Sequence, residues 1–63
     1  MSDFKTRLQA EQSELQEKLE KLNSFIATEN FSKIDDVQQA LLKTQYQAMT
    51  TYLTCLEERL VRL

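Results

Sequence analysis

Glycine and proline are both absent from this sequence of 63 residues. Glycine adopts left-handed backbone angles more readily than other residues, and proline presets the backbone of many tight turns. Sheets built from several hairpins usually need such residues at their turns. A glycine-rich phosphate-binding loop cannot form without glycine. These absences disfavour a β-rich fold and exclude a phosphate site of that kind.

Histidine is also absent, and Cys55 is the single cysteine. A disulfide within the chain is therefore excluded, and the usual ligands of a zinc site are missing. The commonest general base is missing too, and no base or cation lies beside Cys55 in the sequence to activate its thiol. We expect Cys55 to be a small buried side chain in an apolar region. The sequence thus predicts no enzyme activity, no catalytic residue, no metal and no cofactor.

The formal net charge is only −2. It provides no long-range attraction to nucleic-acid phosphates or to anionic membranes. No apolar run approaches the roughly 18 residues that a membrane-spanning helix needs, and the first residues lack a secretory signal pattern. A single unpaired thiol is typical of the cytoplasm. We therefore expect a cytoplasmic protein that does not bind membranes, and the charge disfavours nucleic acid as a partner.

What the sequence does contain is typical of long helices, because leucine, glutamine, glutamate and lysine dominate it. Apolar residues recur in steps of four and three from residue 8 to 26 and again from 42 to 63. Gln12 is the polar residue in the first of these seams. The pattern predicts an all-α, single-domain antiparallel hairpin with helices over 3–27 and 36–62 and a connector over 28–35.

The connector holds the residues that favour helix caps and turns. Asn30 is expected to take the left-handed conformation after the first helix. The second helix is expected to begin with reciprocal capping between Ser32 and Asp35, or between Asp36 and Gln39. At the other end of the chain, Ser2 or Asp3 is expected to cap the first helix.

A second apolar row accompanies the seam of the second helix, at Val37, Leu41, Ala48, Tyr52 and Cys55. One neighbouring helix cannot cover the seam and this row together. So short a chain also buries too little surface to be comfortably stable alone. We therefore expect self-association into a homo-oligomeric helical bundle, with a dimer as first choice and higher states open. The predicted oligomer core is Leu8, Leu15, Leu19, Leu22, Ile26, Leu42, Tyr46, Met49, Leu53, Leu56 and Leu60.

Residues 44–56 carry no charged side chain. Interface cores are poor in charge and rich in tyrosine and methionine, so this stretch has the composition of a surface that becomes buried. It is either covered by sister subunits or free to receive a foreign protein or a small ligand. For the second case, the candidate binding residues are Gln45, Thr50, Tyr52, Thr54, Arg59 and Arg62.

Much of the chain resembles a group of short helical-hairpin proteins of unknown function from tailed bacteriophages and prophages. The resemblance rests on the following positions: Glu14, Leu15, Lys18, Leu19, Lys21, Leu22, Phe25, Ile26, Phe31, Leu41, Leu42, Gln45, Ala48, Met49, Tyr52, Leu56, Arg59 and Leu60. It implies an accessory viral protein that acts in the host cytoplasm. Small phage proteins of this kind often bind and neutralise a host component.

Three functions follow from these observations. The first is an interaction protein that binds a host protein and suppresses a host defence. The second is a sponge that sequesters a nucleotide signalling molecule in clefts between subunits, lined by Tyr46, Tyr52, threonines and an arginine. The third is an RNA-binding regulator similar to the hairpin protein Rop, and it is the weakest because glutamates dominate the exposed face of the first helix.

Overall fold

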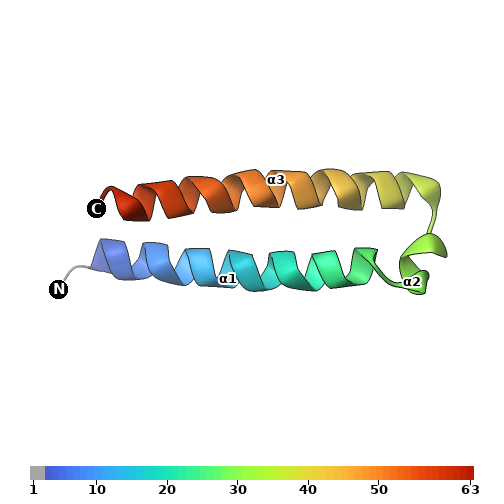
Figure 1. Cartoon of the computed structure of the whole chain (residues 1–63), viewed down its shortest axis with the longest axis horizontal. Helices are drawn as coiled ribbons and strands as arrows, with labels where there is room; N and C mark the ends of the chain where they lie inside the picture. The colour runs from blue at the N-terminus through green and yellow to red at the C-terminus, as the bar shows by residue number, and fades with distance from the viewer. Residues whose placement is uncertain (1–2) are drawn as a thin grey trace.

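The computed structural model describes residues 3–63 and is all-α. Helix α1 covers Asp3–Ile26, the short helix α2 covers Glu29–Ser32, and helix α3 covers Asp36–Val61. Figure 1 shows α1 and α3 lying antiparallel along their whole length, with α2 at the end opposite the start of α1 and the end of α3. The molecule is a rod with extents of 48 × 14 × 13 Å. No helix within residues 3–63 has both the length and the apolar composition that a membrane crossing requires.

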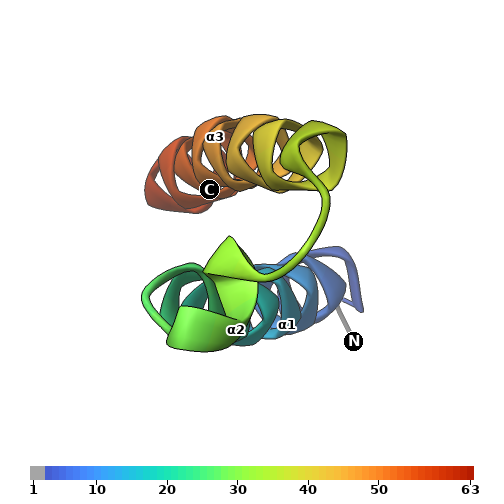
Figure 2. The ribbon, with the colours of Figure 1, turned by 90° about the vertical axis from the view of Figure 1, so that its right-hand side faces the viewer.

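The two long helices pack through the leucine seams that the heptad spacing predicts. Leu8 and Leu15 of α1 and Leu56 of α3 are buried and form one cluster. Met49, Leu53 and Leu60 pack against this cluster and are only partly buried. Seen along the rod, the two helices form a single layer of two (Figure 2). Each helix therefore has one neighbour, and the flanks of the seam lie open to solvent.

The predicted oligomer core lies along this seam within one chain. Its remaining members are half-buried rather than buried: Leu19, Leu22, Ile26, Leu42 and Tyr46. The polar seam residue Gln12 is half-buried as well. Half-burial along most of the seam follows from the two-helix layer, because a helix with a single neighbour cannot enclose its apolar stripe. Contact of these residues with further copies of the chain stays a prediction.

The connector packs onto the end of the hairpin through Phe31. This side chain is 6% exposed, and its ring meets the ring of Phe25 edge to face with 5.9 Å between centroids. The ammonium group of Lys43 lies 5.8 Å from the centroid of Phe31. Ile34 is half-buried beside it. Phe31 therefore covers this end of the core.

The expected left-handed residue at Asn30 is wrong. Asn30 lies inside α2, and no residue among 3–63 has a positive φ angle. The chain leaves α1 instead through a tight turn, in which the amide of Thr28 donates to the carbonyl of Phe25 at 3.0 Å. The Thr28 hydroxyl donates to the same carbonyl at 2.7 Å. Two donors thus satisfy a carbonyl at the end of α1, and no left-handed cap is needed.

Neither predicted reciprocal cap forms at the start of α3. Asp35 alone is the N-cap, and its Oδ2 accepts from the amides of Val37 at 3.1 Å and Gln38 at 3.3 Å. The hydroxyl of Ser32 donates back to the carbonyl of Glu29. The Gln39 amide donates to the carbonyl of Ile34 at 2.9 Å. At the other end, Asp3 is the first residue of α1, and the expected cap at Ser2 falls outside the described residues.

Replacing Asp35 by alanine is expected to lower the free energy of unfolding by about 0.5 to 2 kcal/mol, because two amides at the start of α3 lose their acceptor. Chemical denaturation followed by circular dichroism measures this change. The matched control is Asp35→Asn, which keeps an oxygen at the same place and should change the stability by less than half as much. Equal losses in both variants would contradict the capping role.

Candidate interaction surface

The second apolar row of α3 is exposed to solvent in the single chain. Its members are Val37, Leu41, Ala48, Tyr52 and Cys55, and we call this set the α3 row. Val37 is 64% exposed, Leu41 57% and Tyr52 45%. The expectation that one neighbouring helix cannot cover both the seam and this row is confirmed. Cys55 was expected to be buried, and this is wrong for the single chain, because Cys55 lies on the flank of α3 and not in its seam.

The threonines of the uncharged stretch have their hydroxyl protons engaged within α3. The hydroxyl groups donate to the carbonyl four residues earlier, at 2.9 Å for Thr50 and 3.1 Å for Thr51 and Thr54. Thr44 makes the same contact with Ala40 at 3.0 Å. A threonine hydroxyl that donates to its own helix has no proton left for another partner. The methyl group and the remaining lone pair of that side chain point outward. Burying this stretch against a partner therefore leaves few donors unsatisfied.

The six candidate binding residues do not lie together. Gln45, Tyr52 and Arg59 follow one another in steps of seven, which places them on one side of a helix with about 3.6 residues per turn. Thr50 and Thr54 lie on a different side, and both hydroxyls donate to the carbonyls of α3. This set of six stays a prediction, and the structure divides it between two sides of α3.

Arg62 is bound within its own helix. One of its guanidinium nitrogens lies 2.6 Å from the Oε1 of Glu58 and also donates to the Glu58 carbonyl. Glu58 and Arg62 thus form an ion pair one helical turn apart, and so do Glu17 and Lys21, at 3.3 Å. Both pairs are mostly exposed. They therefore lie on solvated faces of the helices and stabilise them only slightly.

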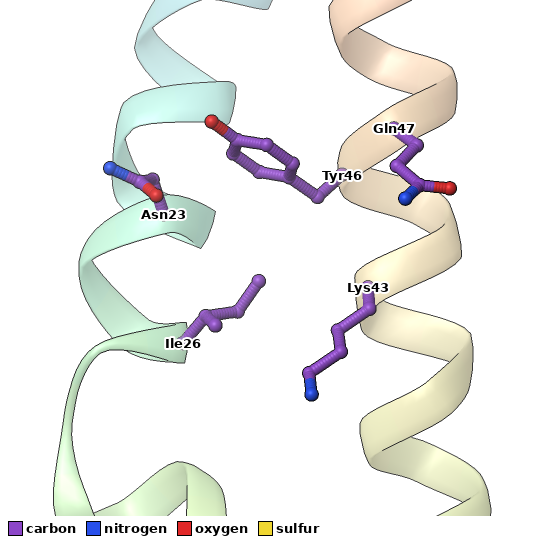
Figure 3. Close-up of a pocket in the computed structure, with 5 residues that line it drawn as sticks. All are labelled: Asn23, Ile26, Lys43, Tyr46 and Gln47. Carbon is purple, nitrogen blue, oxygen red and sulfur yellow. The ribbon is translucent and has the colours of Figure 1, made fainter.

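A hollow of about 270 Å³ opens between α1 and α3, close to α2. It is lined by Asn23, Ile26, Lys43, Tyr46 and Gln47, and we call it the Tyr46 hollow. Figure 3 shows the Tyr46 ring reaching across from α3 toward α1, with the side chain of Ile26 below it and the amide of Asn23 near its hydroxyl. The side chain of Lys43 extends from α3 and places its ammonium group below the side chain of Ile26, while the side chain of Gln47 lies over α3, away from the Tyr46 ring. The hollow therefore combines a half-buried aromatic ring, a cation and the Asn23 amide.

Sequence reasoning identified Tyr46 and missed the three polar residues around it. Asn23, Lys43 and Gln47 carry no distinguishing pattern in the sequence, since each is an ordinary exposed residue of a long helix. These residues line one hollow because α1 and α3 are antiparallel, which places the C-terminal end of α1 beside the N-terminal half of α3. Tyr52, which was expected to line the same cleft as Tyr46, belongs to the α3 row on another side of the helix.

A second hollow of about 330 Å³ lies toward the end with the termini. Phe4, Arg7, Leu8, Glu11 and Arg59 line it, and we call it the arginine hollow. The guanidinium carbon of Arg59 lies 5.9 Å from the centroid of the Phe4 ring, and Phe4 is 51% exposed. Within residues 3–63 there is no group of three or more histidine, cysteine, aspartate or glutamate residues placed to hold a metal ion.

Comparison with known proteins agrees with the expected phage resemblance. A protein from Enterobacteria phage T4, described as an uncharacterized 7.5 kDa protein in the denB-rIIB intergenic region, is 31% identical over 62 residues. The match covers 98% of this chain and 97% of the relative. No solved structure matches. The family model described as Sequestin matches residues 2–62, and the chain therefore belongs to the Sequestin family.

Proposed function

We propose that this chain is a non-enzymatic phage protein that binds a component of the host cell and withholds it, and that it does so as an assembly of identical chains. The description of its family supports sequestration, and its relative from phage T4 supports a viral origin. The action takes place in the host cytoplasm, where a single unpaired thiol is normal. Suppression of a host defence is the consequence that we propose for infection.

The cargo that the geometry supports best is a small nucleotide signal, bound at the Tyr46 hollow. The observation that carries this choice is the set of groups that line the hollow: an aromatic ring for stacking, the Lys43 ammonium group for a phosphate, and the amide of Asn23 for a base or ribose. The hollow is open, so a ligand larger than 270 Å³ can extend out of it. The sequence alone favours a host protein over a nucleotide as the cargo, and the geometry of the hollow reverses that order.

We expect a cyclic nucleotide from a screened panel to raise the melting temperature of the protein in proportion to the logarithm of its concentration. The variant Tyr46→Leu keeps an apolar side chain beside Ile26 and removes the ring and hydroxyl, and we expect it to weaken binding at least about tenfold, a loss of roughly 1.4 kcal/mol. Equilibrium dialysis measures this affinity. The control is Lys18→Gln, which changes an exposed residue on the solvated face of α1 and should bind as the original chain does.

Two results would contradict the nucleotide proposal. One is the lack of any thermal shift at millimolar nucleotide across the panel. The other is equal loss of affinity in Tyr46→Leu and in the Lys18→Gln control, since that would separate binding from the Tyr46 hollow.

The second candidate cargo is a host protein, and the observation that favours it is the exposure of the α3 row. Apolar and uncharged groups in a continuous strip are typical of a protein contact. Capture from host lysate by the immobilised chain tests this candidate. If the α3 row binds the captured protein, the variant Leu41→Arg should no longer capture it. The control variant Lys18→Gln, on the solvated face of α1, should still capture it.

A further inference from the structure

We propose that two copies of this chain dock through their α3 rows, with the two α3 helices antiparallel and Ala48 of both chains on the two-fold axis. The inference deepens the self-association in the proposed function and rests on it. In this arrangement the α3 row binds a second copy of the chain, and the Tyr46 hollow remains accessible to the cargo.

On the side of α3 that carries the row, the spacing between successive residues is the same from either end of the helix. Positions 37, 41, 44, 48, 52, 55 and 59 follow one another in steps of four, three, four, four, three and four. Ala48 is the midpoint of this series. A closed two-fold contact requires a patch in which a residue faces a second residue and that second residue faces the first. Antiparallel pairing about Ala48 meets this requirement, since each position of the series then faces another position of the series.

The pairs produced by this symmetry are complementary in size. Leu41 faces the partner's Cys55, and Tyr52 faces the partner's Thr44, so that a large side chain meets a small one at each level. Ala48 faces the partner's Ala48, and two small residues at the axis allow the helices to approach closely. The pairing covers the exposed apolar groups of Leu41 and Tyr52 over a strip about 33 Å long, at about 1.5 Å per residue. Cys55 becomes a buried small side chain in this dimer.

The ends of the row are complementary in charge. Val37 faces the partner's Arg59, which lines the arginine hollow together with Arg7. Asp35 and Asp36 directly precede Val37 and begin α3. None of these acidic or basic groups takes part in a side-chain ion pair among residues 3–63. The symmetry thus brings the acidic start of each α3 to the arginine hollow of the other chain, while the centre of the contact holds no charge.

A parallel arrangement of the two α3 helices lacks these features. It sets each residue against its own copy, so that Tyr52 meets Tyr52 and Leu41 meets Leu41. The two Arg59 guanidinium groups also meet, and like charges across a contact are unfavourable by several kcal/mol. The antiparallel pairing avoids this electrostatic conflict.

Disulfide trapping of the full chain tests the proposed register. In a Cys55→Ser background, Ala48→Cys places one thiol per chain on the axis, within the Cα separation of about 4.4 to 6.8 Å that a disulfide needs, and should cross-link at least about ten times faster than the control under mild oxidation. The control is Thr50→Cys in the same background, because position 50 is exposed on another side of the same helix. Sedimentation equilibrium of the reduced variants verifies that both remain dimers.

The native thiol distinguishes the two orientations. Antiparallel pairing separates Cys55 from the partner's Cys55 by about 21 Å along the axis, so the unmodified chain should not cross-link when it is folded. Adding Leu41→Cys to the unmodified chain should link position 41 to the partner's Cys55, and peptide mapping identifies that bond. Links between two copies of Cys55, or between two copies of position 41, would instead establish parallel pairing and overturn the proposal.

Two further results would also overturn it. One is equal cross-linking at positions 48 and 50, and the other is a monomer by sedimentation equilibrium at micromolar concentration. Failure of nucleotide binding is a separate outcome, because it is measured by dialysis and leaves the cross-linking pattern unchanged. A dimer with the expected links and no cargo would therefore refute the proposed cargo and support the proposed contact.

Discussion

Replacing Leu56 by aspartate should prevent the chain from folding. Leu56 is 0% exposed and packs with Leu8 and Leu15 in the one cluster of buried residues along the seam. Truncating a buried leucine alone costs about 2 to 5 kcal/mol. A carboxylate at this place also loses its hydration without gaining a partner. A chain of this length has only about 3 to 9 kcal/mol of stability in total, so the loss is comparable to the whole.

Circular dichroism at 222 nm and analytical gel filtration measure this effect, as the loss of helical signal and the expansion of the chain. The control is Val61→Asp, which adds the same charge to the same helix at a residue that is 78% exposed. It should keep the helical signal and lower stability by less than about 1 kcal/mol, because Val61 is exposed and a carboxylate in the last turn of a helix is only slightly unfavourable. A folded Leu56→Asp variant would mean that the seam is not the core of the molecule.

Replacing Ala48 by glutamate should dissociate the proposed dimer. The two-fold axis brings the two new carboxylates together in a contact that otherwise has no charge. Like charges placed against each other are unfavourable by several kcal/mol, and about 2.7 kcal/mol corresponds to a hundredfold change in affinity. We therefore expect the dimer dissociation constant to rise at least about a hundredfold in sedimentation equilibrium. Glutamate is a good helix former, so α3 itself should remain intact at high concentration.

The control for this prediction is Thr50→Glu, which adds the same side chain two residues away on another side of α3. Its dissociation constant should stay within about threefold of the original, because an exposed helical position tolerates glutamate with little change in free energy. If both variants dissociate equally, the dimer contact does not lie along the α3 row. If neither does, the two-fold axis does not pass near Ala48.

The connector illustrates where sequence reasoning loses precision. Several neighbouring residues there are able to cap a helix, and Ser32, Asp35 and Asp36 are all chemically suitable. The choice among them depends on which amides and carbonyls the tertiary packing leaves free. Packing of Phe31 against Phe25 sets that geometry, because it turns part of the connector into α2 and leaves Asp35 at the start of α3. Asn30 then lies inside a helix, where a left-handed angle is excluded.

Of the six candidate binding residues, the sequence pattern groups three on one side of α3. Gln45, Tyr52 and Arg59 repeat every seven residues, and that periodicity alone places them together on a helix. The Tyr46 hollow was not predictable in full, since Asn23 and Lys43 belong to different helices with no pattern that relates them. Their meeting depends on the relative displacement of two rods, which local periodicity does not encode.

The two long helices, the seam that joins them and the excess of apolar surface on α3 are all predictable from the amino-acid sequence. These properties follow from the spacing of leucines and from the composition, both of which act through local helix geometry. The packing of α1 against α3 sets which part of that apolar surface stays exposed, where Cys55 lies, and which polar groups line the hollow at Tyr46. Each of the two helices can bury only one stripe, so their register and rotation place every other side chain in the core, on the open flank or in a hollow.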